Sequence, residues 1–229
     1  MISVIIPTLN AEARLAEAMT ALVPAAVDGL VREVIVIDGG SGDRTAAIAD
    51  QAGANFVVRT GGRGYQLAAG AHRARFPWLL FLHADTVLEP GWERDAVAFM
   101  DAVDAGKRPL AAAAFRFALD DDGVRPRLLE RMVALRCALL RLPYGDQGVL
   151  IPKLLYAEVG GYNPHPLMED VDFVRRLGRR RLTMLRPRAV TSAARYRRDG
   201  YLLRSMRNLM CLSLYFLRVP TSVLNRIYG

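Results

Sequence analysis

Short apolar runs alternate with helical stretches through the first half of the chain, and this alternation constrains the fold more than any other feature. The runs at residues 3–7, 33–37 and 54–58 each have the length of a strand. The stretches at residues 11–23 and 45–52 are rich in alanine and separate these runs, which favours helices between the strands. Strands that alternate with helices usually pair in parallel. The pattern therefore predicts an α/β fold with a parallel sheet covered by helices.

A fourth apolar run, at residues 79–82, predicts a strand that is buried on both faces. The polar segment 83–86 follows it directly. Because open α/β sheets bind ligands beyond the carboxyl ends of their strands, we expect Asp85 to lie over a crevice. A carboxylate there suits a divalent cation that carries a phosphate. The alternative is that Asp85 caps a following turn and His83 satisfies a buried hydrogen bond.

Two glycine-rich loops point to anion binding. The segment 38–45 allows a tight turn with exposed amides, and Ser41 or Asp43 can cap the helix that begins at Thr45. The segment 59–66 places glycines before a second helix, which is a natural anion site. It lacks the ending of a P-loop, and the glycines at 39–42 lack the dinucleotide spacing. Nucleoside-triphosphatase and dinucleotide motifs are therefore not supported.

The second half is predicted to contain strands at residues 110–119, 149–151, 182–185 and 189–193, and helices at 90–105 and 128–142. We expect the latter helix to dock on the sheet or cover the cleft through its periodic apolar residues, which are Leu128, Leu129, Met132, Leu135, Leu139 and Leu142. The acidic turn at 120–122 is interpreted as a solvated loop rather than a metal site.

Three carboxylates, those of Glu169, Asp170 and Asp172, stand at the predicted start of a helix. The helix dipole favours negative charge there, which explains them without any function. The functional alternative makes one of them a general base.

The chain ends in a strongly apolar stretch, residues 201–217, that also contains arginines. We expect this helix to pack on the protein's own core or on a second subunit, and contact with a membrane interface through residues 201–218 is the alternative. It is too short and too charged to span a bilayer. The N-terminus carries no basic leader, so no signal peptide is expected.

The bulk composition is that of a single globular domain, with 229 residues and a formal net charge of +8. The basic excess is almost entirely arginine and crowds the C-terminal third. It indicates an anionic small molecule or a membrane surface, unless it is only a solvated face; nucleic acid is not expected, because no binding motif is present. Cys137 and Cys211 are predicted to be reduced, buried and structural, which favours a cytoplasmic location, at most peripheral on the inner face of the membrane.

Taken in order, these motifs resemble family-2 glycosyltransferases of the GT-A (nucleotide-diphospho-sugar transferase) fold, which has a mostly parallel Rossmann-like sheet flanked by helices. The matching segments are residues 4–10, 36–45, 61–70, 80–85, 160–162 and 169–170. The resemblance implies one domain over residues 1–229. Within it, residues 1–105 would bind the nucleotide, residues 106–200 would bind the acceptor, and residues 201–229 would form an apolar and basic C-terminal helix.

The resemblance also implies an activity, namely inverting transfer of one sugar from a nucleotide-diphosphate sugar to an acceptor hydroxyl. Asp85, with His83, would hold Mg²⁺ or Mn²⁺ on the diphosphate. Asp170 would be the general base, beside Glu169. Arginines, Arg63 and members of the cluster at 179–198, would stabilise the leaving group. The nucleotide-sugar site implied by the family comprises Pro7, Thr8, Asn10, Glu12, Asp38, Arg63, Gln66, Ala84 and Asp85.

Two positions depart from the family pattern: His83 stands where the metal motif has its first aspartate, and Gly39 replaces a second aspartate near the base. A compact subgroup, part of which is associated with arsenosugar biosynthesis, shares the His-Ala-Asp-Thr and Tyr-Gly-Asp-Gln segments. That similarity implies an acceptor or sugar pocket lined by Tyr144, Asp146 and Gln147.

Two other functions remain open from the sequence. A GT-A fold could serve as a catalytically silent binding module at a membrane surface. A nucleotidyltransferase would also use a parallel sheet and metal-held phosphates, but it should carry a glycine-rich loop after its first strand, and residues 8–12 contain no glycine.

Overall fold

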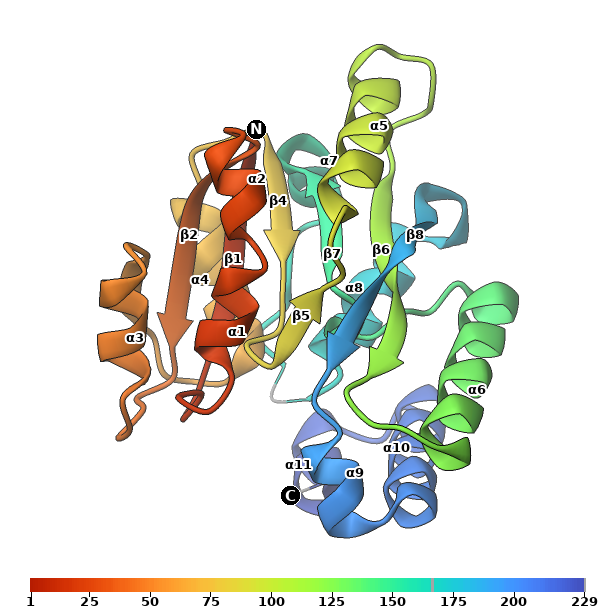
Figure 1. Ribbon diagram of the computed structural model, residues 1–229. Coiled ribbons are helices and arrows are strands. Elements are labelled where there is room, and N and C mark those ends of the chain that lie inside the picture. The colour runs from red at the N-terminus through yellow and green to blue at the C-terminus, as the bar shows by residue number, and fades with distance from the viewer. Residues whose placement is uncertain (166, 229) are drawn as a thin grey trace.

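Four parallel strands form the N-terminal part of the sheet, as the alternating pattern predicts. They are β1 (Ile2–Thr8), β2 (Val31–Asp38), β3 (Asn55–Val58) and β4 (Trp78–Phe81). The computed structural model describes residues 1–165 and 167–228 and orders these strands β3-β2-β1-β4 (Figure 1). Every position of β1 and β4 is buried, because helices cover both faces. Their shared direction brings the loops after β1, β2 and β4 to one edge of the sheet.

The remaining strands make the sheet mixed. They are β5 (Thr86–Leu88), β6 (Ala112–Leu119), β7 (Val149–Pro152) and β8 (Leu182–Thr191). Strand β7 lies antiparallel between β4 and β6, and β8 pairs in parallel with β6 and antiparallel with β5. The full order is β3-β2-β1-β4-β7-β6-β8-β5. The α/β fold is confirmed, with a mixed sheet in which the parallel strands are concentrated in the first half.

The two strands expected at 182–185 and 189–193 are one strand, β8. Strand β5 was not predicted from the sequence. Residues 186–188 are charged or proline, which interrupts the apolar pattern, yet they continue the strand because their side chains are exposed or half-buried. The pairing of β8 with β6 shifts register there, between Ala114 and Arg116. The prediction failed because an interruption of the apolar pattern was taken as the end of a strand.

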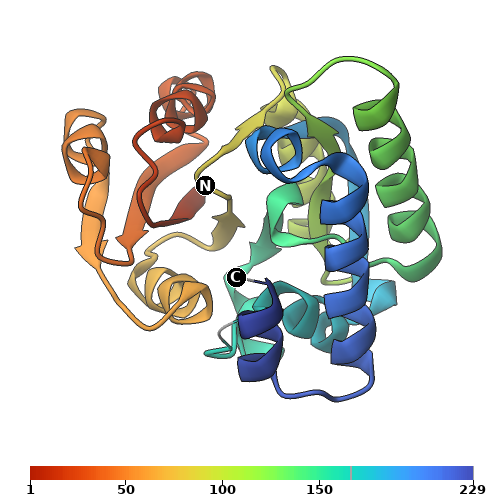
Figure 2. The ribbon, with the colours of Figure 1, turned by 90° about the horizontal axis from the view of Figure 1, so that it is seen from below.

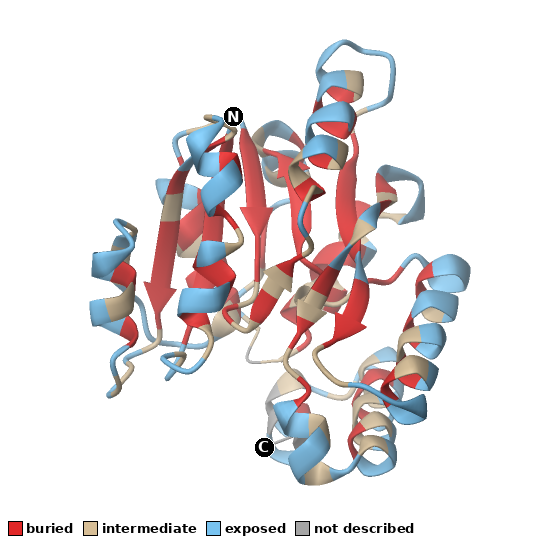
Figure 3. Ribbon diagram, in the orientation of Figure 1, coloured by how far each residue is buried: buried red, intermediate tan, exposed pale blue. Residues whose placement is uncertain are grey.

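Helices cover both faces of the sheet. Their bounds are α1 (Leu15–Thr20), α2 (Val23–Val27), α3 (Thr45–Gln51), α4 (Arg63–Arg73), α5 (Trp92–Asp104), α6 (Val124–Leu140), α7 (Lys153–Glu158), α8 (Glu169–Leu177), α9 (Ala194–Asp199), α10 (Tyr201–Phe216) and α11 (Thr221–Tyr228). Helices α1, α2, α3 and α5 pack on one face, and α4, α7, α8, α10 and α11 pack on the other. The helix expected at 11–23 begins later and is divided into α1 and α2. Figure 3 shows the strands buried between these layers.

Helix α6 contradicts the prediction of which leucines dock. Its buried side consists of Pro126, Leu129, Val133 and Cys137, which pack on β6. Leu128, Met132, Leu135 and Leu139 are exposed. Apolar residues occur around most of this helix, so periodicity alone could not identify the side that faces the sheet.

The C-terminal helices α9, α10 and α11 lie below the carboxyl ends of β6 and β8, on the opposite side of the molecule from β2 (Figures 1 and 2). Cys211, Leu212 and Leu224 anchor α10 and α11 to the core, which agrees with the expected packing on the protein's own core. None of the described helices is long and apolar enough to cross a membrane. Cys137 and Cys211 are free and buried, as predicted.

An aromatic cluster joins β4 to α8. Tyr162 stacks on Phe173 with ring centroids 4.4 Å apart, and it meets Phe81 edge-on at 4.9 Å. Aromatic pairs in these orientations each contribute about 0.5–1.5 kcal/mol beyond the area they bury. The cluster therefore fixes the start of α8 against the end of β4, where the predicted site residues lie.

Candidate active site

The loops after β1 and β2 are bound together by reciprocal hydrogen bonds. The Asn10 amide N–H donates to Ser41 Oγ at 2.7 Å, and the Gly42 N–H donates to Asn10 Oδ1 at 3.0 Å. The Glu12 carboxylate accepts from the Arg44 N–H at 2.9 Å. The predicted nucleotide loop and the glycine-rich loop thus form one unit, which the hydrogen bonds of Asn10 and Glu12 hold together.

The Asp38 carboxylate is committed to this same unit. It is 2% exposed and accepts hydrogen bonds from Thr8 Oγ1 at 2.9 Å and from the N–H groups of Gly40 and Ser41 at 2.8 and 2.7 Å. Burial opposes the charge, but the bonds from Ser41, Thr8 and Gly40 outweigh it and lower the pKa of Asp38 below its ordinary value. Asp38 therefore stabilises the conformation of the loop at residues 38–45.

Gln66 ties the ends of β1 and β2 to α4. Its Nε2 donates to the carbonyl oxygens of Thr8 and Ile37, both at 2.8 Å, and the side chain is buried. A Cβ added at Gly39 would lie 3.2 Å from that Nε2 and 3.3 Å from the Thr8 oxygen. The glycine at 39, which departs from the family pattern, leaves the space that this glutamine needs.

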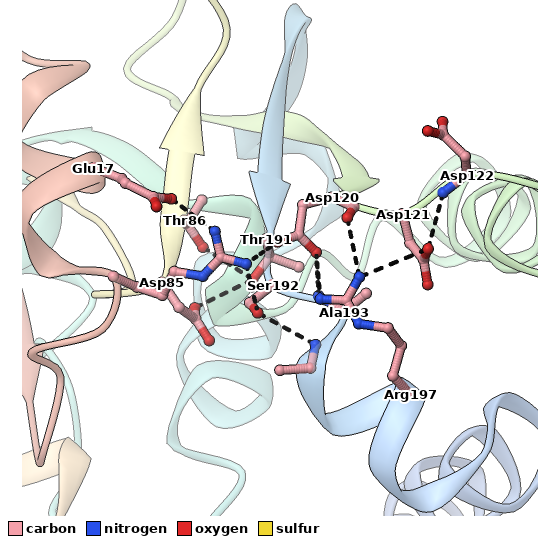
Figure 4. A network of polar contacts seen from close by, with 12 residues as sticks. Glu17, Asp85, Thr86, Asp120, Asp121, Asp122, Thr191, Ser192, Ala193 and Arg197 are labelled. Carbon is pink, nitrogen blue, oxygen red and sulfur yellow. Dashed lines mark hydrogen bonds and ion pairs between the residues drawn. The ribbon is translucent and has the colours of Figure 1, made fainter.

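The segment after β4 presents His83 and Asp85 together. His83 Nδ1 contacts Asp85 Oδ1, and Thr191 Oγ1 donates to the same oxygen at 3.2 Å (Figure 4). Burial opposes ionisation, but His83, with help from Arg195 and Thr191, lowers the pKa of Asp85 to about 2. The side chain of Asp85 is 25% exposed, so the ionised carboxylate can still meet a ligand. Ala84, between the two, is buried.

Across the edge of the sheet, Arg63 from the start of α4 joins both carboxylates at the start of α8. Its Nε donates to Glu169 Oε1, and its Nη2 lies 3.3 Å from Asp170 Oδ2. Burial disfavours the guanidinium charge, yet Glu169 and Asp170 raise the pKa of Arg63 further above its ordinary value. The Gly145 N–H donates to Asp170 Oδ2 at 2.7 Å. Asp170 is thereby positioned by an arginine and a backbone amide.

A close backbone approach allows this arrangement. A Cβ added at Gly64 would lie 2.3 Å from the carbonyl oxygen of Asn163 and 3.1 Å from the His165 nitrogen. Since no side chain fits there, the loop before α8 can run directly over the first turn of α4. Glu169 and Asp170 consequently come within reach of Arg63.

Two side chains of the Tyr-Gly-Asp-Gln segment, those of Tyr144 and Gln147, make contacts inside the protein. Gln147 is buried: its Nε2 donates to the Phe115 oxygen at 2.9 Å, and its Oε1 accepts from the Tyr144 N–H at 3.3 Å. Gln147 therefore anchors the turn. The Tyr144 ring lies under the Arg136 guanidinium, 3.5 Å from the ring centroid, and burial raises the pKa of Tyr144 to about 12.

Asp146 is the unsatisfied group of the site. Its Oδ1 is buried and has no hydrogen-bond partner among the described residues. Burial raises the pKa of Asp146 above its ordinary value; Asp170 adds to the rise, while Arg136, His83 and Arg63 oppose it. A buried carboxylate oxygen without a partner is costly, so this oxygen is a candidate for binding a ligand.

One small pocket collects residues from both sides of the sheet edge. His83 and Asp170 both line it, whereas Asp85 contacts His83 but does not itself line the pocket. The remaining lining residues are Pro7, Arg63, Leu67, Phe81, Leu82, Gly145, Val149 and Tyr162. Its volume of about 10 Å³ is enough for one water molecule, so a larger ligand would have to lie in its mouth.

The donor set at this edge fits a divalent cation that is only partly held by protein. Within residues 1–165 and 167–228, no group of three or more His, Cys, Asp or Glu side chains could hold a metal ion. His83 and Asp85 offer two adjacent ligand atoms. Mg²⁺ usually takes one or two carboxylates and fills its other positions with water and substrate phosphates. The single carboxylate of Asp85 is therefore sufficient when water and a diphosphate supply the remaining ligands.

Four of the eight arginines between residues 179 and 198 pair with acidic residues, and none of the eight lines the pocket. Arg188 pairs with Glu89 at 2.8 Å, Arg181 pairs with Glu158 at 2.7 Å, and Arg197 lies within 3.8 Å of Asp120 and Asp121 (Figure 4). The acidic turn at 120–122 thus serves to dock the C-terminal segment. Arg195 differs, because its charge acts on Asp85.

Two residues of the candidate site were not predicted from the sequence. Thr191 stands at the end of β8, where the strand boundary was misplaced, and Arg136 lies within the regular apolar pattern of α6. Neither position carries a motif that could have signalled its contact with Asp85 or Tyr144.

The model of the family described as "Glycosyl transferase family 2" matches residues 3–108. Residues 3–108 of the chain are therefore similar to glycosyl transferase family 2. That stretch includes β1 to β4 with the Asp38 and Asp85 loops. The glycosyltransferase activity expected from the resemblance is confirmed by this match, and no curated protein matches the chain.

Solved structures share the fold over most of the chain. TarS 1–349 from S. aureus is 18% identical with a TM-score of 0.63, covering 99% of this chain and 69% of that one. It has also been solved with UDP-GlcNAc. Glucosyl-3-phosphoglycerate synthase from Mycobacterium tuberculosis, solved with Mn²⁺ and UDP-glucose, is 22% identical with a TM-score of 0.57 and covers 84% of this chain and 69% of that one. At such identities the likeness establishes the GT-A fold.

Substituting Gly64 with alanine tests the close approach of the loop to α4. The added Cβ would displace the backbone at Asn163, so we expect Gly64→Ala to lose about 1–3 kcal/mol of unfolding free energy. Chemical denaturation measures this. Gly42→Ala is the matched control, because nothing lies within 4 Å of its added Cβ and its φ is not positive. Equal stability of both variants would show that the loop does not depend on this contact.

Substituting Asp146 with asparagine tests the unsatisfied carboxylate. Since burial raises the folded-state pKa, ionisation costs stability above that pKa, and the cost vanishes as the pH falls below the unfolded value of about 3.9. We therefore expect Asp146→Asn to be more stable at neutral pH, by on the order of 1 kcal/mol, with an advantage that narrows on acidification. Denaturation at a series of pH values measures this, with the exposed Asp101→Asn as control. A constant difference across pH would contradict it.

Proposed function

We propose that the protein is an inverting glycosyltransferase that moves one sugar from a nucleotide-diphosphate sugar to an acceptor hydroxyl. The observation that carries the proposal is that His83, which contacts Asp85, and Asp170 line the same pocket from opposite elements, β4 and α8. The proposed metal-binding residue His83 and the proposed proton acceptor Asp170 therefore border the same pocket, where the sugar would lie between them. Uridine-diphosphate sugars are the first donors to test, because both TarS and the mycobacterial synthase have been solved with one.

The nucleotide would lie along the joined loops of residues 8–12 and 38–45, whose conformation Asp38 and Gln66 maintain. His83 and Asp85 would hold Mg²⁺ or Mn²⁺, which supplies positive charge to the departing diphosphate. The ionised Asp85 favours a cation at that position, and Arg195 adds positive charge beside it. The mycobacterial synthase was solved with Mn²⁺, which supports a divalent cation.

Asp170 would be the general base. Its carboxylate would accept the proton of the acceptor hydroxyl while that oxygen forms a bond to the anomeric carbon and the diphosphate oxygen leaves from the opposite face. Arg63 and the Gly145 N–H hold one carboxylate oxygen in place. Glu169 acts through Arg63 as a positioning residue. Attack opposite to the leaving group inverts the anomeric configuration.

Tyr144 and Asp146 are proposed to border the acceptor or sugar, with the unsatisfied Asp146 oxygen accepting a hydroxyl hydrogen bond. We propose further that residues 1–105 bind the nucleotide, that residues 106–200 bind the acceptor, and that the whole of residues 1–229 acts as one transferase domain.

Two aspartate variants separate the proposed roles. Asp85→Asn should lose donor binding that depends on Mn²⁺, whereas Asp170→Asn should keep that binding and lose turnover by about 10²–10⁴-fold. Calorimetry with UDP-glucose and UDP-GlcNAc measures binding, and release of UDP measures turnover. Asp101→Asn, an exposed carboxylate on α5, is the control.

Normal turnover by Asp170→Asn would refute the assignment of the base. Normal Mn²⁺-dependent binding by Asp85→Asn would refute the assignment of the metal side. Binding without turnover in the parent protein would favour the catalytically silent module.

A further inference from the structure

Helices α6 and α10 each present a row of apolar side chains to solvent. On α6 the row consists of Leu128, Met132, Leu135 and Leu139, which follow one another at helical spacing and are 56–60% exposed. On α10 it consists of Leu202, Leu203, Met206, Leu209 and Met210, which are 45–76% exposed. These nine residues define the apolar face discussed below.

The apolar face does not stabilise the fold. Each helix already buries a different side, with Leu129, Val133 and Cys137 on α6 and Cys211 and Leu212 on α10. Apolar side chains scattered singly over a surface need no explanation, but a continuous group usually marks an interaction site. The second apolar side of each helix therefore requires a partner outside the described chain.

The two rows belong to one surface. Helix α10 lies next to the lower end of α6 in Figure 1, and the two helices lie side by side over part of their length in Figure 2. Tyr201, at the start of α10, packs with the cluster that contains Leu129 and Val133 of α6, and its hydroxyl donates to Asp121 just before α6 at 2.6 Å. An object that touches one row can therefore touch the other.

Within α6 and α10 the charged residues are mostly arginine, whereas Asp121, Asp122 and Asp199 lie just before the two helices. Residues 200–229 contain four arginines and no aspartate or glutamate. Residues 124–141 contain five arginines and a single acidic residue, Glu130, which is paired with Arg127. Arg125, Arg131 and Arg218 are exposed at the borders of the rows. An apolar stripe flanked by arginines matches a bilayer with anionic headgroups, where each basic residue adds about 1 kcal/mol of attraction.

The same charges argue against a second copy of this chain as the partner. A symmetric dimer would place the face against itself and bring the exposed arginines of both copies near one another, where like charges repel. No described helix spans a bilayer, so the contact would be along the membrane surface.

We propose that the apolar face of α6 and α10 binds the surface of an anionic lipid bilayer. The leucines and methionines enter the boundary between headgroups and acyl chains, and the flanking arginines contact lipid phosphates. The inference does not depend on the transferase reaction, because it concerns a different surface.

Co-sedimentation of the full chain with phosphatidylcholine vesicles, with and without phosphatidylglycerol, tests the proposal. We expect binding to the anionic vesicles and its loss as salt screens the arginines. Leu135→Gln and Leu209→Gln should each weaken binding roughly tenfold, since each removes one leucine that would be buried in the bilayer. Leu154→Gln is the matched control, being equally exposed but on α7. Arg131→Gln should weaken anionic binding, whereas the exposed Arg32→Gln should not.

Circular dichroism establishes that each variant is folded. Failure to bind anionic vesicles, or equal binding by the Leu135 and Leu154 variants, would overturn the proposal. Analytical ultracentrifugation without lipid supplies a second readout: a dimer that Leu135→Gln or Leu209→Gln dissociates would overturn it as well, by assigning the face to a second copy.

Discussion

The candidate active site depends on the ion pairs that Arg63 makes with Glu169 and Asp170. Glu169 is almost completely buried, so its charge is tolerated only because the guanidinium lies beside it. Removing one partner of a buried ion pair typically costs about 3–5 kcal/mol, because the other charge is left uncompensated. These contacts connect the first turn of α4 to the first turn of α8, which are far apart in sequence. Together with the aromatic cluster and the close approach at Gly64, they position the second side of the pocket.

The two sides of the pocket are built by different means. On the side of β1, β2 and β4, parallel strands deliver the loops to one edge, and buried groups such as Asp38 and Gln66 set the loop conformations. On the side of α8, an aromatic cluster and the close approach at Gly64 determine where Asp170 lies. The first side follows from topology, whereas the second depends on contacts between segments that do not share a strand pairing.

This difference explains what could be predicted from the sequence. Strands β1, β2 and β4 were recognised, because a buried parallel strand is a largely continuous apolar run, and the less buried edge strand β3 was recognised from its apolar residues 56–58. The long strand β8 was divided, because charged residues and a proline interrupt its apolar pattern, although it pairs with β6 on both sides of the interruption. Strand β5 was missed because a three-residue strand has no period to detect. The buried side of α6 could not be chosen, since leucines occur around most of the helix.

The candidate site shows the same limit. Short motifs identified His83, Asp85 and Asp170, but a motif does not distinguish a side chain that meets a ligand from one that supports a loop. Asp38 and Gln147 are of the second kind, with their polar atoms engaged inside the protein. Thr191 and Arg136 could be found only once the chain was folded.

The end of β8 has a mechanical consequence. Ser192 donates its N–H to the Asp85 carbonyl oxygen at 3.2 Å, and Thr191 holds the Asp85 side chain, while α9 begins two residues later and leads into α10. A displacement of α9 along its axis would pull on the backbone and the side chain of Asp85 together. The C-terminal helices are thus connected to the end of β8 that contacts Asp85. A movement of these helices would be transmitted to that carboxylate through residues 191–193.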